Sequence, residues 1–190
     1  MRLFVAIDLP EAIRAGIARL MTQLKPASPG LRWGHPGGIH LTLKFIGEVA
    51  GQQSAGIRRA LGEVKGMQPA EIRVAGAGFF PNDKHARLFW IGVEANPALG
   101  ELAEAIESKL DALGVRREER AFHPHLTLGR FREPENPFAL KEAITSAGAI
   151  DLGSFGAREF YLFQSYLSPK GAEYTKLERY LFAPEILGNG

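Results

Sequence analysis

A short motif that carries both an imidazole and a hydroxyl occurs twice in this sequence. His-Leu-Thr-Leu stands at residues 40–43 and again at residues 125–128. In a β-strand alternate side chains share a face, so His40 and Thr42 are expected to point one way and the leucines the other. The same holds for His125 and Thr127. A single copy would be an ordinary strand histidine, but two copies at matching places in a repeat favour a functional pair.

Two imidazoles that face each other, each with a hydroxyl two residues on, suit in-line displacement at phosphorus. Near pH 7 one histidine can take a proton from water while the other gives a proton to the leaving oxygen. The hydroxyls of Thr42 and Thr127 can donate to phosphate oxygens on which charge develops. Such a site needs neither a nucleophilic side chain nor a metal if the substrate brings strain, as a five-membered cyclic phosphate does.

Two cations close to the motifs are further candidates for phosphate binding. Lys44 is in phase with His40 and Thr42, so it is expected on their face of the strand. Arg130 is out of phase with His125 unless Gly129 marks a bulge or the strand ends there. For each cation, exposure to solvent is the alternative.

The remaining histidines suggest a metal site, but the sequence does not favour one. His123 and His125 flank Pro124, and His35 and His40 could join them. The chain has no cysteine and no HExxH motif, and no carboxylate stands at ligand spacing. We therefore expect no metal and no other cofactor, with His123 at a strand entry, His35 in a loop and His85 in a surface turn.

Hydrophobic periodicity places the motifs on strands in an alternation of strands and helices. Pro10 and Pro97 each begin an apolar stripe of helical spacing. Pro and Gly clusters end the elements, and Ser168–Gly171 predicts a turn. We expect strands at residues 2–8, 39–46, 71–80, 87–94, 121–131, 160–167 and 173–182, and helices at residues 10–24, 52–65, 97–113 and 138–147.

The two motifs belong to a longer internal repeat. Leu3-Phe4 matches Leu88-Phe89 at a spacing of 85 residues, the same spacing that separates the motifs. Both halves run in the order strand, Pro-started helix, connection and motif strand. This order predicts two related lobes about a pseudo-twofold axis, with the motif strands facing each other.

Composition narrows the class of protein further. With 190 residues, 45% hydrophobic and 23% charged, the chain is an ordinary globular one. A net charge of +2 does not by itself indicate a nucleic-acid binder. Without cysteine there are no disulfides and no thiolate chemistry. The apolar run after Met1 is too short for a signal segment or a membrane span. We expect a soluble, cytoplasmic protein that does not bind membranes.

The paired motif and its flanking blocks resemble a known family. Two HxTx motifs in a duplicated chain of this length are similar to the 2H phosphoesterase superfamily. Within it, the blocks resemble RNA 2′,3′-cyclic phosphodiesterases, also called 2′-5′ RNA ligases. The resemblance extends from Arg2 to about Phe182. The blocks are RLFVAIDLP, IHLTLKFIGEV, GFFPN, LFWIGVE, FHPHLTLGRF and the tail SYLSPKGAEY.

The resemblance implies a fold and a reaction. The fold is α+β, a single domain over residues 1–190 built of two duplicated lobes. Each lobe is an antiparallel sheet with outer helices, and a central cleft lies between them. The reaction is hydrolysis of an RNA 2′,3′-cyclic phosphodiester end to a 2′-phosphomonoester, without metal, and 2′-5′ ligation also occurs in the family. His40 matches the proton donor and His125 the acceptor, while Thr42 and Thr127 match the phosphate-binding threonines.

Two rival functions remain at the level of the sequence. One is an RNA- or nucleotide-binding module that keeps the fold without turnover, and the other is an esterase for small cyclic nucleotides. The expected partner is an RNA with a 2′,3′-cyclic phosphate end or a small cyclic nucleotide, and we expect the protein to be a monomer. Aromatic residues are candidates for stacking a base, although core packing is favoured for most of them. They are Trp33, Phe45, Tyr161, Phe163 and Tyr166.

Overall fold

The computed structural model describes residues 1–168 and 171–184, and it contains four α-helices and nine strands in this part of the chain. The turn predicted at Ser168–Gly171 includes residues 169–170, which lie outside the described residues. In chain order the elements are β1 (Arg2–Ile7), α1 (Glu11–Leu24), β2 (Leu31–Trp33), β3 (Leu41–Glu48), α2 (Gly51–Gly62), β4 (Ala70–Phe80), β5 (Ala86–Ala95), α3 (Pro97–Asp111), β6 (His125–Glu135), α4 (Phe138–Ala147), β7 (Asp151–Ala157), β8 (Glu159–Ser168) and β9 (Gly171–Leu181).

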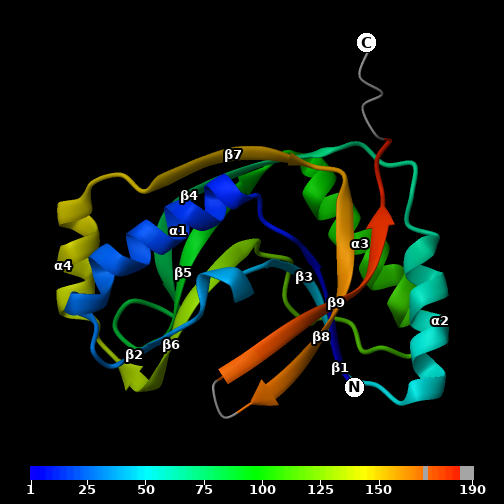
Figure 1. The fold of residues 1–190 in the computed structure, drawn as a ribbon, viewed down its shortest axis with the longest axis horizontal. Coiled ribbons are helices and arrows are strands. Elements are labelled where there is room, and N and C mark those ends of the chain that lie inside the picture. Colours follow the sequence, from blue (N-terminus) through cyan, green and yellow to red (C-terminus); the bar gives the residue numbers. More distant parts are fainter. Residues whose placement is uncertain (169–170, 185–190) are drawn as a thin grey trace.

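The strands form two antiparallel sheets (Figure 1). One has four strands in the order β3-β1-β8-β9, and the other has five in the order β2-β6-β5-β4-β7. The pairing of β1 with β3 in the first sheet corresponds to the pairing of β5 with β6 in the second. The chain is therefore an α+β protein of two lobes, as the sequence predicts.

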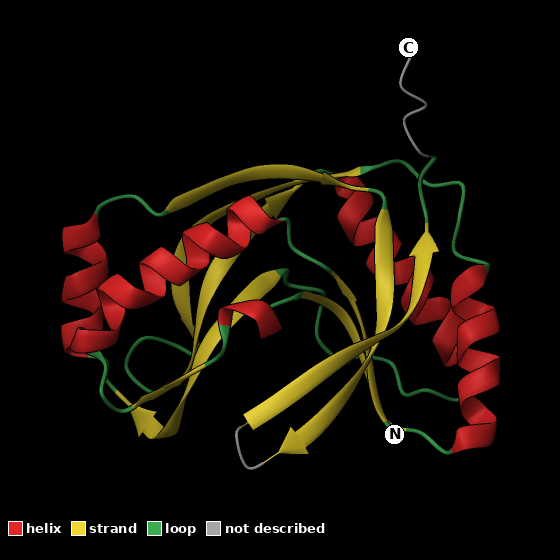
Figure 2. Ribbon diagram, viewed as in Figure 1, coloured by secondary structure: helices red, strands yellow, loops and turns green. Residues whose placement is uncertain are grey.

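Each lobe is covered by helices that come partly from the other half of the repeat (Figure 2). Helix α1 follows β1 of the four-stranded sheet but packs on the five-stranded lobe, where it contacts β7 and α4. Helix α3 follows β5 of the five-stranded sheet and packs mainly against β3 and α2 of the other lobe, while it also contacts β4 of its own sheet. The two lobes thus exchange their first helices.

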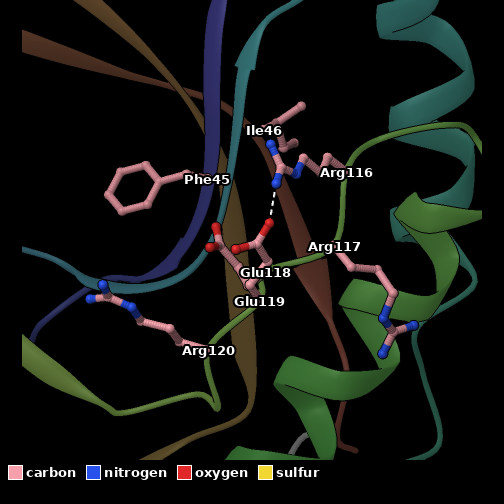
Figure 3. Close-up of a pocket in the computed structure, with 7 residues that line it drawn as sticks. All are labelled: Phe45, Ile46, Arg116, Arg117, Glu118, Glu119 and Arg120. Atoms are coloured by element: carbon pink, nitrogen blue, oxygen red, sulfur yellow. Dashed lines mark hydrogen bonds and ion pairs between the residues drawn. The ribbon is translucent and has the colours of Figure 1, made fainter.

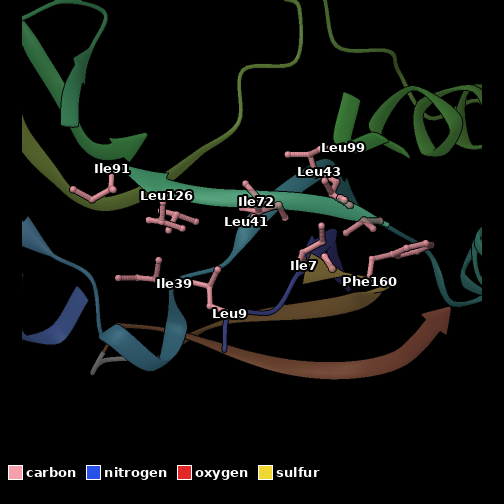
Figure 4. Close-up of a cluster of buried hydrophobic side chains, with 14 of the residues drawn as sticks. Ile7, Leu9, Ile39, Leu41, Leu43, Ile72, Ile91, Leu99, Leu126 and Phe160 are labelled. Carbon is pink, nitrogen blue, oxygen red and sulfur yellow. The ribbon is translucent and has the colours of Figure 1, made fainter. Parts of the chain in front are cut away.

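A single apolar core connects the lobes because of this exchange. The motif leucines of both halves lie in one buried cluster with the apolar stripes of α1 and α3 (Figure 4). Leu41 and Leu126 are completely buried in it. The predicted stripe of α1 faces this cluster, through Ile13, Ile17, Leu20 and Leu24. No helix in the described part of the chain is long and apolar enough to cross a membrane.

The sequence pattern misses two strands and misplaces two strand starts. β2 has only three residues and β7 is rich in glycine, so neither shows a clear period. β6 begins at His125 and not near residue 121, because Pro124 cannot donate to the ladder. His40 lies just before β3, which begins at Leu41.

The two identical Leu-Phe pairs are not structurally equivalent. Phe4 pairs with Phe45 on β3, whereas Leu88 pairs with Arg130 on β6, at the matching place in the repeat. Phe4 therefore corresponds to Leu88, and the sequence match is displaced by one residue. Because strand side chains alternate, this displacement puts Phe89 in the main core and Phe4 on the opposite face.

A β-bulge interrupts each motif strand at the same place. On β3 the register passes from Thr42 to Lys44, so Leu43 has no partner, and on β6 it passes from Thr127 to Gly129. Each bulge shifts the alternation by one residue. We call the face of each sheet that carries Thr42 or Thr127 its motif face. The helices cover the opposite face.

Gly129 is required where β2 pairs with β6. A Cβ at this position would lie 2.8 Å from Leu31 Cγ and 3.0 Å from the Arg32 carbonyl oxygen. The equivalent residue on β3 is Lys44, because β3 is an edge strand and has room for a side chain there.

Replacement of Gly129 by alanine is expected to lower the free energy of unfolding by about 1–3 kcal/mol, because β2 must move away from the added methyl group. Urea denaturation measures this change. Gly51→Ala is the matched control, since a Cβ there meets nothing within 4 Å. Equal stability of the two variants would contradict the close approach of β2.

Candidate functional site

His40 lies at the entrance of β3 within a group of aromatic rings. Its ring centroid is 4.4 Å from that of Phe163, 5.2 Å from that of Tyr174 and 5.8 Å from that of Phe4. Phe4 and Phe163 stack on each other at 5.1 Å. These rings come from β1, β8 and β9, so three strands of the four-stranded sheet hold the imidazole in place.

His125 occupies the corresponding position in the other lobe. Its ring lies 5.1 Å from Phe80 and 6.3 Å from Trp90. His123 lies beside the same two rings. Trp90 can lie against β4 only because residue 78 is glycine, where a Cβ would come within 2.3 Å of the indole.

Both imidazoles are oriented by the same kind of hydrogen bond. Nδ1 of His125 lies 2.7 Å from the carbonyl oxygen of His123, two residues earlier. His40 makes a backbone hydrogen bond to Gly38, again two residues earlier. When Nδ1–H of a neutral imidazole donates to a carbonyl, Nε2 keeps its lone pair. His125 thus has a free ring nitrogen that can accept a proton.

A cluster of three charged residues supports the segment that leads to His40. Arg14 forms an ion pair with Asp8, and Asp8 also pairs with Lys176. The Arg14 guanidinium donates to the carbonyl oxygens of Leu9, Pro36 and Ile39, at 3.0–3.3 Å. It therefore fixes the loop directly before His40.

This cluster contains site residues that sequence reasoning misses. Arg14 lies on α1 and Lys176 on β9, and no motif connects them with residue 40. Asp8 directly follows the first strand. The sequence signal that could have pointed to Asp8 is therefore a carboxylate at the end of a buried apolar run. Burial raises the pKa of Asp8, but Lys176 and Arg14 outweigh it and hold that pKa below its usual range.

The surroundings of His40 disfavour its charged form. Burial and, after it, the nearby positive charges of Arg14 and Lys176 together lower the pKa of His40 to about 4, although Asp8 and the hydrogen bond to Gly38 act in the opposite direction. The imidazole is therefore neutral near pH 7 in the ligand-free protein. An anion bound beside the ring would reverse this preference, because opposite charges favour the protonated form.

The two motif strands contact each other although they belong to different sheets. Thr42 lies opposite Ala6, and Thr127 lies opposite Trp90. Both threonines are half-buried on the motif faces. The structure therefore brings together strands β3 and β6, at whose beginnings His40 and His125 stand.

The expectation that Lys44 shares a face with His40 is wrong. The Lys44 side chain is only 1% exposed, and its Nζ lies 2.6 Å from Glu107 Oε1 and 2.6 Å from the Arg116 carbonyl oxygen. The bulge at Leu43 turns Lys44 toward α3, on the face opposite Thr42. Lys44 is thus a buried structural cation, and it does not reach the motif face.

Arg130 lies on the motif face for the same reason. The bulge at Leu128 brings it back into phase, so that it stands opposite Leu88 and on the same face as Thr127. Its side chain is exposed. A bulge therefore does bring Arg130 into phase, as the sequence allowed, but its unpaired residue is Leu128 and Gly129 is paired with Phe89.

The other histidines have local structural roles. His35 Nδ1 accepts a hydrogen bond from the Gly37 N–H at 3.1 Å and so begins a single 3₁₀ turn. His85 is exposed in the turn around Asn82. Across residues 1–168 and 171–184, no three His, Asp or Glu side chains converge in a way that would hold a metal ion.

Comparison with known proteins gives the same division into halves. Residues 7–90 and 91–174 each match a family model described as LigT like phosphoesterase. An RNA 2′,3′-cyclic phosphodiesterase of Archaeoglobus fulgidus is 38% identical over 177 residues, which is 93% of this chain and 98% of that protein. One of Methanothermobacter thermautotrophicus is 35% identical over 178 residues, with coverages of 93% and 96%.

Solved structures share the whole fold. A crystal structure of a Thermus thermophilus protein matches with a TM-score of 0.76 at 30% identity, covering 96% of this chain and 98% of that one. The crystal structure of E. coli LigT complexed with 3′-AMP matches with a TM-score of 0.75 at 27% identity, with coverages of 95% and 97%.

Removal of one partner of the buried pair is expected to be costly. Glu107→Ala leaves the Lys44 ammonium buried without a counter-ion and should destabilise the fold by about 3–5 kcal/mol. Glu119→Ala, which breaks an exposed pair with Arg116, is the control and should have little effect. Urea denaturation measures both. Lys44→Met with Glu107→Leu should recover most of the stability, and a failure to recover it would contradict a purely structural pair.

Burial of His40 predicts a pH-dependent stability. Because the pKa of about 4 in the folded state lies below the unfolded value of 6.5, the unfolded chain binds more protons between these values. Stability should therefore fall by up to about 3 kcal/mol as pH drops from about 6.5 to about 4. His40→Gln should remove this part of the slope in urea titrations, whereas His85→Gln should keep it. Equal slopes in all three proteins would refute the shift.

Proposed function

We propose that this chain, which belongs to the LigT-like phosphoesterase family, hydrolyses 2′,3′-cyclic phosphodiester ends of RNA to 2′-phosphomonoesters by acid–base catalysis with His40 and His125. One observation supports the proposal above all others. The two histidines stand at equivalent places at the beginnings of two contacting strands, His40 directly before β3 and His125 as the first residue of β6, and a carbonyl two residues earlier orients each ring. Relatives named RNA 2′,3′-cyclic phosphodiesterase match over nearly the whole chain.

His125 acts as the base in this proposal. Its Nε2 takes a proton from a water molecule, and the water oxygen attacks phosphorus. The bond from phosphorus to the ribose 3′ oxygen breaks, and the phosphate stays on the 2′ oxygen. The hydrogen bond from Nδ1–H to the His123 carbonyl supports this role, because it stabilises the positive charge that the ring acquires.

His40 acts as the acid and gives its proton to the leaving 3′ oxygen. In the ligand-free protein its pKa of about 4 leaves the ring neutral. The donor role therefore requires the bound phosphodiester anion to raise this pKa, since a negative charge beside the ring favours imidazolium. Asp8 acts in the same direction.

Thr42 and Thr127 bind the non-bridging phosphate oxygens, and Arg130 is a third ligand for them. Their positions on the motif faces support this assignment. A 5′-hydroxyl of a second RNA in place of water would form a 2′-5′ linkage with the same leaving oxygen. Ligation is therefore the same displacement with another nucleophile, and the same two histidines would serve it.

Turnover of defined substrates tests the function. A short RNA with a 2′,3′-cyclic phosphate end and 2′,3′-cyclic mononucleotides are offered in excess EDTA, and products are identified by chromatography. We expect a 2′-phosphomonoester, formed at an undiminished rate in chelator because side chains supply every required group. A binding module would give no product. Loss of activity in EDTA with recovery on added zinc or manganese would contradict the two-histidine mechanism.

Substitution of each histidine tests the roles. His40→Ala and His125→Ala should each lower kcat/KM on the RNA substrate by roughly 10²–10⁴-fold. A nitrophenolate leaves without a proton, so on a nitrophenyl phosphodiester His40→Ala should regain much of its deficit while His125→Ala stays impaired. His85→Ala is the matched control and should behave as wild type on both substrates. The opposite pattern would exchange the two roles.

A further inference from the structure

A surface cavity lies beside the motif face of the four-stranded sheet (Figure 3). Its volume is about 480 Å³, within the range of small-molecule sites. It is lined by Phe45 and Ile46 of β3 and by the loop of residues 116–120. Neither proton-transfer histidine lines it.

The loop that lines this cavity is fixed by the buried Lys44–Glu107 pair. Lys44 Nζ donates to the Arg116 carbonyl oxygen at 2.6 Å, and the Glu118 N–H donates to Glu107 Oε1 at 3.0 Å. The loop is thus tied at two points to the pair that includes Lys44, the residue directly before Phe45. The wall of the cavity is therefore held in place without a ligand.

Phe45 is a large apolar side chain that the fold leaves exposed. It is 58% exposed, and its only ring neighbour in the described part of the chain is Phe4, at 6.1 Å. Phe4 in turn lies 5.8 Å from His40. The exposed ring therefore stands two ring contacts away from the proposed acid, on the same face of the sheet.

The charges around the cavity leave one arginine available. Arg117 pairs with Glu104 and Asp111, and Arg116 pairs with Glu119. Arg120 makes no ion pair with any residue in the ranges that the structure describes. In Figure 3 the guanidinium of Arg120 extends to the same side as the Phe45 ring, whereas Arg117 turns toward α3.

From these observations we propose that Phe45 and Arg120 form a subsite for the nucleotide directly 5′ of the cyclic phosphate. A 2′,3′-cyclic phosphate ends its strand, so the rest of an RNA substrate can extend only in the 5′ direction. The base of the penultimate nucleotide stacks on Phe45, and Arg120 pairs with the phosphate that joins the last two nucleotides. This inference rests on the proposed function and specifies its substrate as an RNA strand.

The subsite is tested by comparing two substrates of different length. Phe45→Ala should lower kcat/KM for a dinucleotide with a 2′,3′-cyclic end by roughly tenfold, mainly through KM, because one base-stacking contact is lost. The variant should hydrolyse 2′,3′-cyclic AMP at the wild-type rate, and Phe45→Trp should restore the dinucleotide activity. Phe138→Ala is the matched control, since Phe138 is also an exposed phenylalanine, on α4 of the other lobe.

Salt dependence tests the arginine. Arg120→Ala should reduce the slope of log KM against log salt for the dinucleotide by roughly 0.7, as expected for one lost phosphate contact on a single strand. Arg59→Ala, at an exposed position of α2, should leave the slope unchanged.

In the comparison of the two substrates, an equal loss of kcat/KM of Phe45→Ala on both, or no loss on either, would overturn the subsite.

A binding measurement separates this inference from the proposed reaction. A dinucleotide 3′-phosphate with 2-aminopurine as its first base should lose fluorescence on binding to the wild type, because the base stacks, and much less on binding to Phe45→Ala. If the wild type hydrolyses neither cyclic substrate, the proposed function fails while this readout still decides the subsite. Equal quenching by both proteins would overturn the subsite while leaving the reaction intact.

Discussion

The antiparallel pairing of each motif strand with its neighbour, interrupted by one unpaired leucine, determines which residues after the motif share a face with its threonine. Side chains before the bulge alternate between the two faces of the sheet in phase with the motif. Side chains after it alternate in the opposite phase, because the bulge inserts one unpaired residue. Leu43 and Leu128 are the unpaired residues on β3 and β6. Because of these bulges Phe45 and Arg130 return to the motif face, while Lys44 and Gly129 turn toward the core.

The same bulge has different consequences in the two lobes because the neighbouring strands differ. β6 has β2 along its outer edge, which leaves no space for a side chain at Gly129. β3 is an edge strand, so Lys44 can extend to α3 and pair with Glu107. On the motif faces, Phe45 of β3 occupies the position that Arg130 occupies on β6. The duplicated scaffold has become chemically asymmetric through its strand edges.

Most of the fold follows from patterns in the sequence, and the exceptions have physical causes. The structure confirms the motif strands, the Pro-started helices and the two-lobed α+β architecture. These features can be predicted because the hydrophobic period and the internal repeat each extend over many residues. β2 and β7 escape prediction because three residues or a glycine-rich run carry no period. The predicted face of Lys44 is wrong because a bulge shifts the alternation of side chains by one residue, and nothing in the sequence around Leu43 signals it. For Arg130 the neighbouring Gly129 is such a signal.

The site can be predicted only as far as its motifs extend. The motif positions of His40 and His125 are visible in the sequence, and their roles remain predictions. The support around His40 is not visible, since Asp8, Arg14 and Lys176 come from a strand end, a helix and the last strand of the chain. These residues meet only through the tertiary fold. The depressed pKa of His40 follows from burial among the surrounding rings and then from the charges of Arg14 and Lys176, so no local pattern contains it.

The exchange of first helices between the lobes bears on how such a chain can arise. Helix α1 covers the five-stranded lobe, and α3 packs on β3 and α2 of the four-stranded lobe as well as on β4, so in a half-length chain the first helix would lack the partners that the other half supplies. Two identical half-length chains could supply these helices to each other only as a swapped homodimer. The stability of such a dimer would depend on protein concentration. Joining them in one polypeptide makes that assembly intramolecular and independent of concentration. After fusion each copy is free to diverge, and the two halves now differ at equivalent positions of their motif strands, where one has Phe45 and the other Arg130.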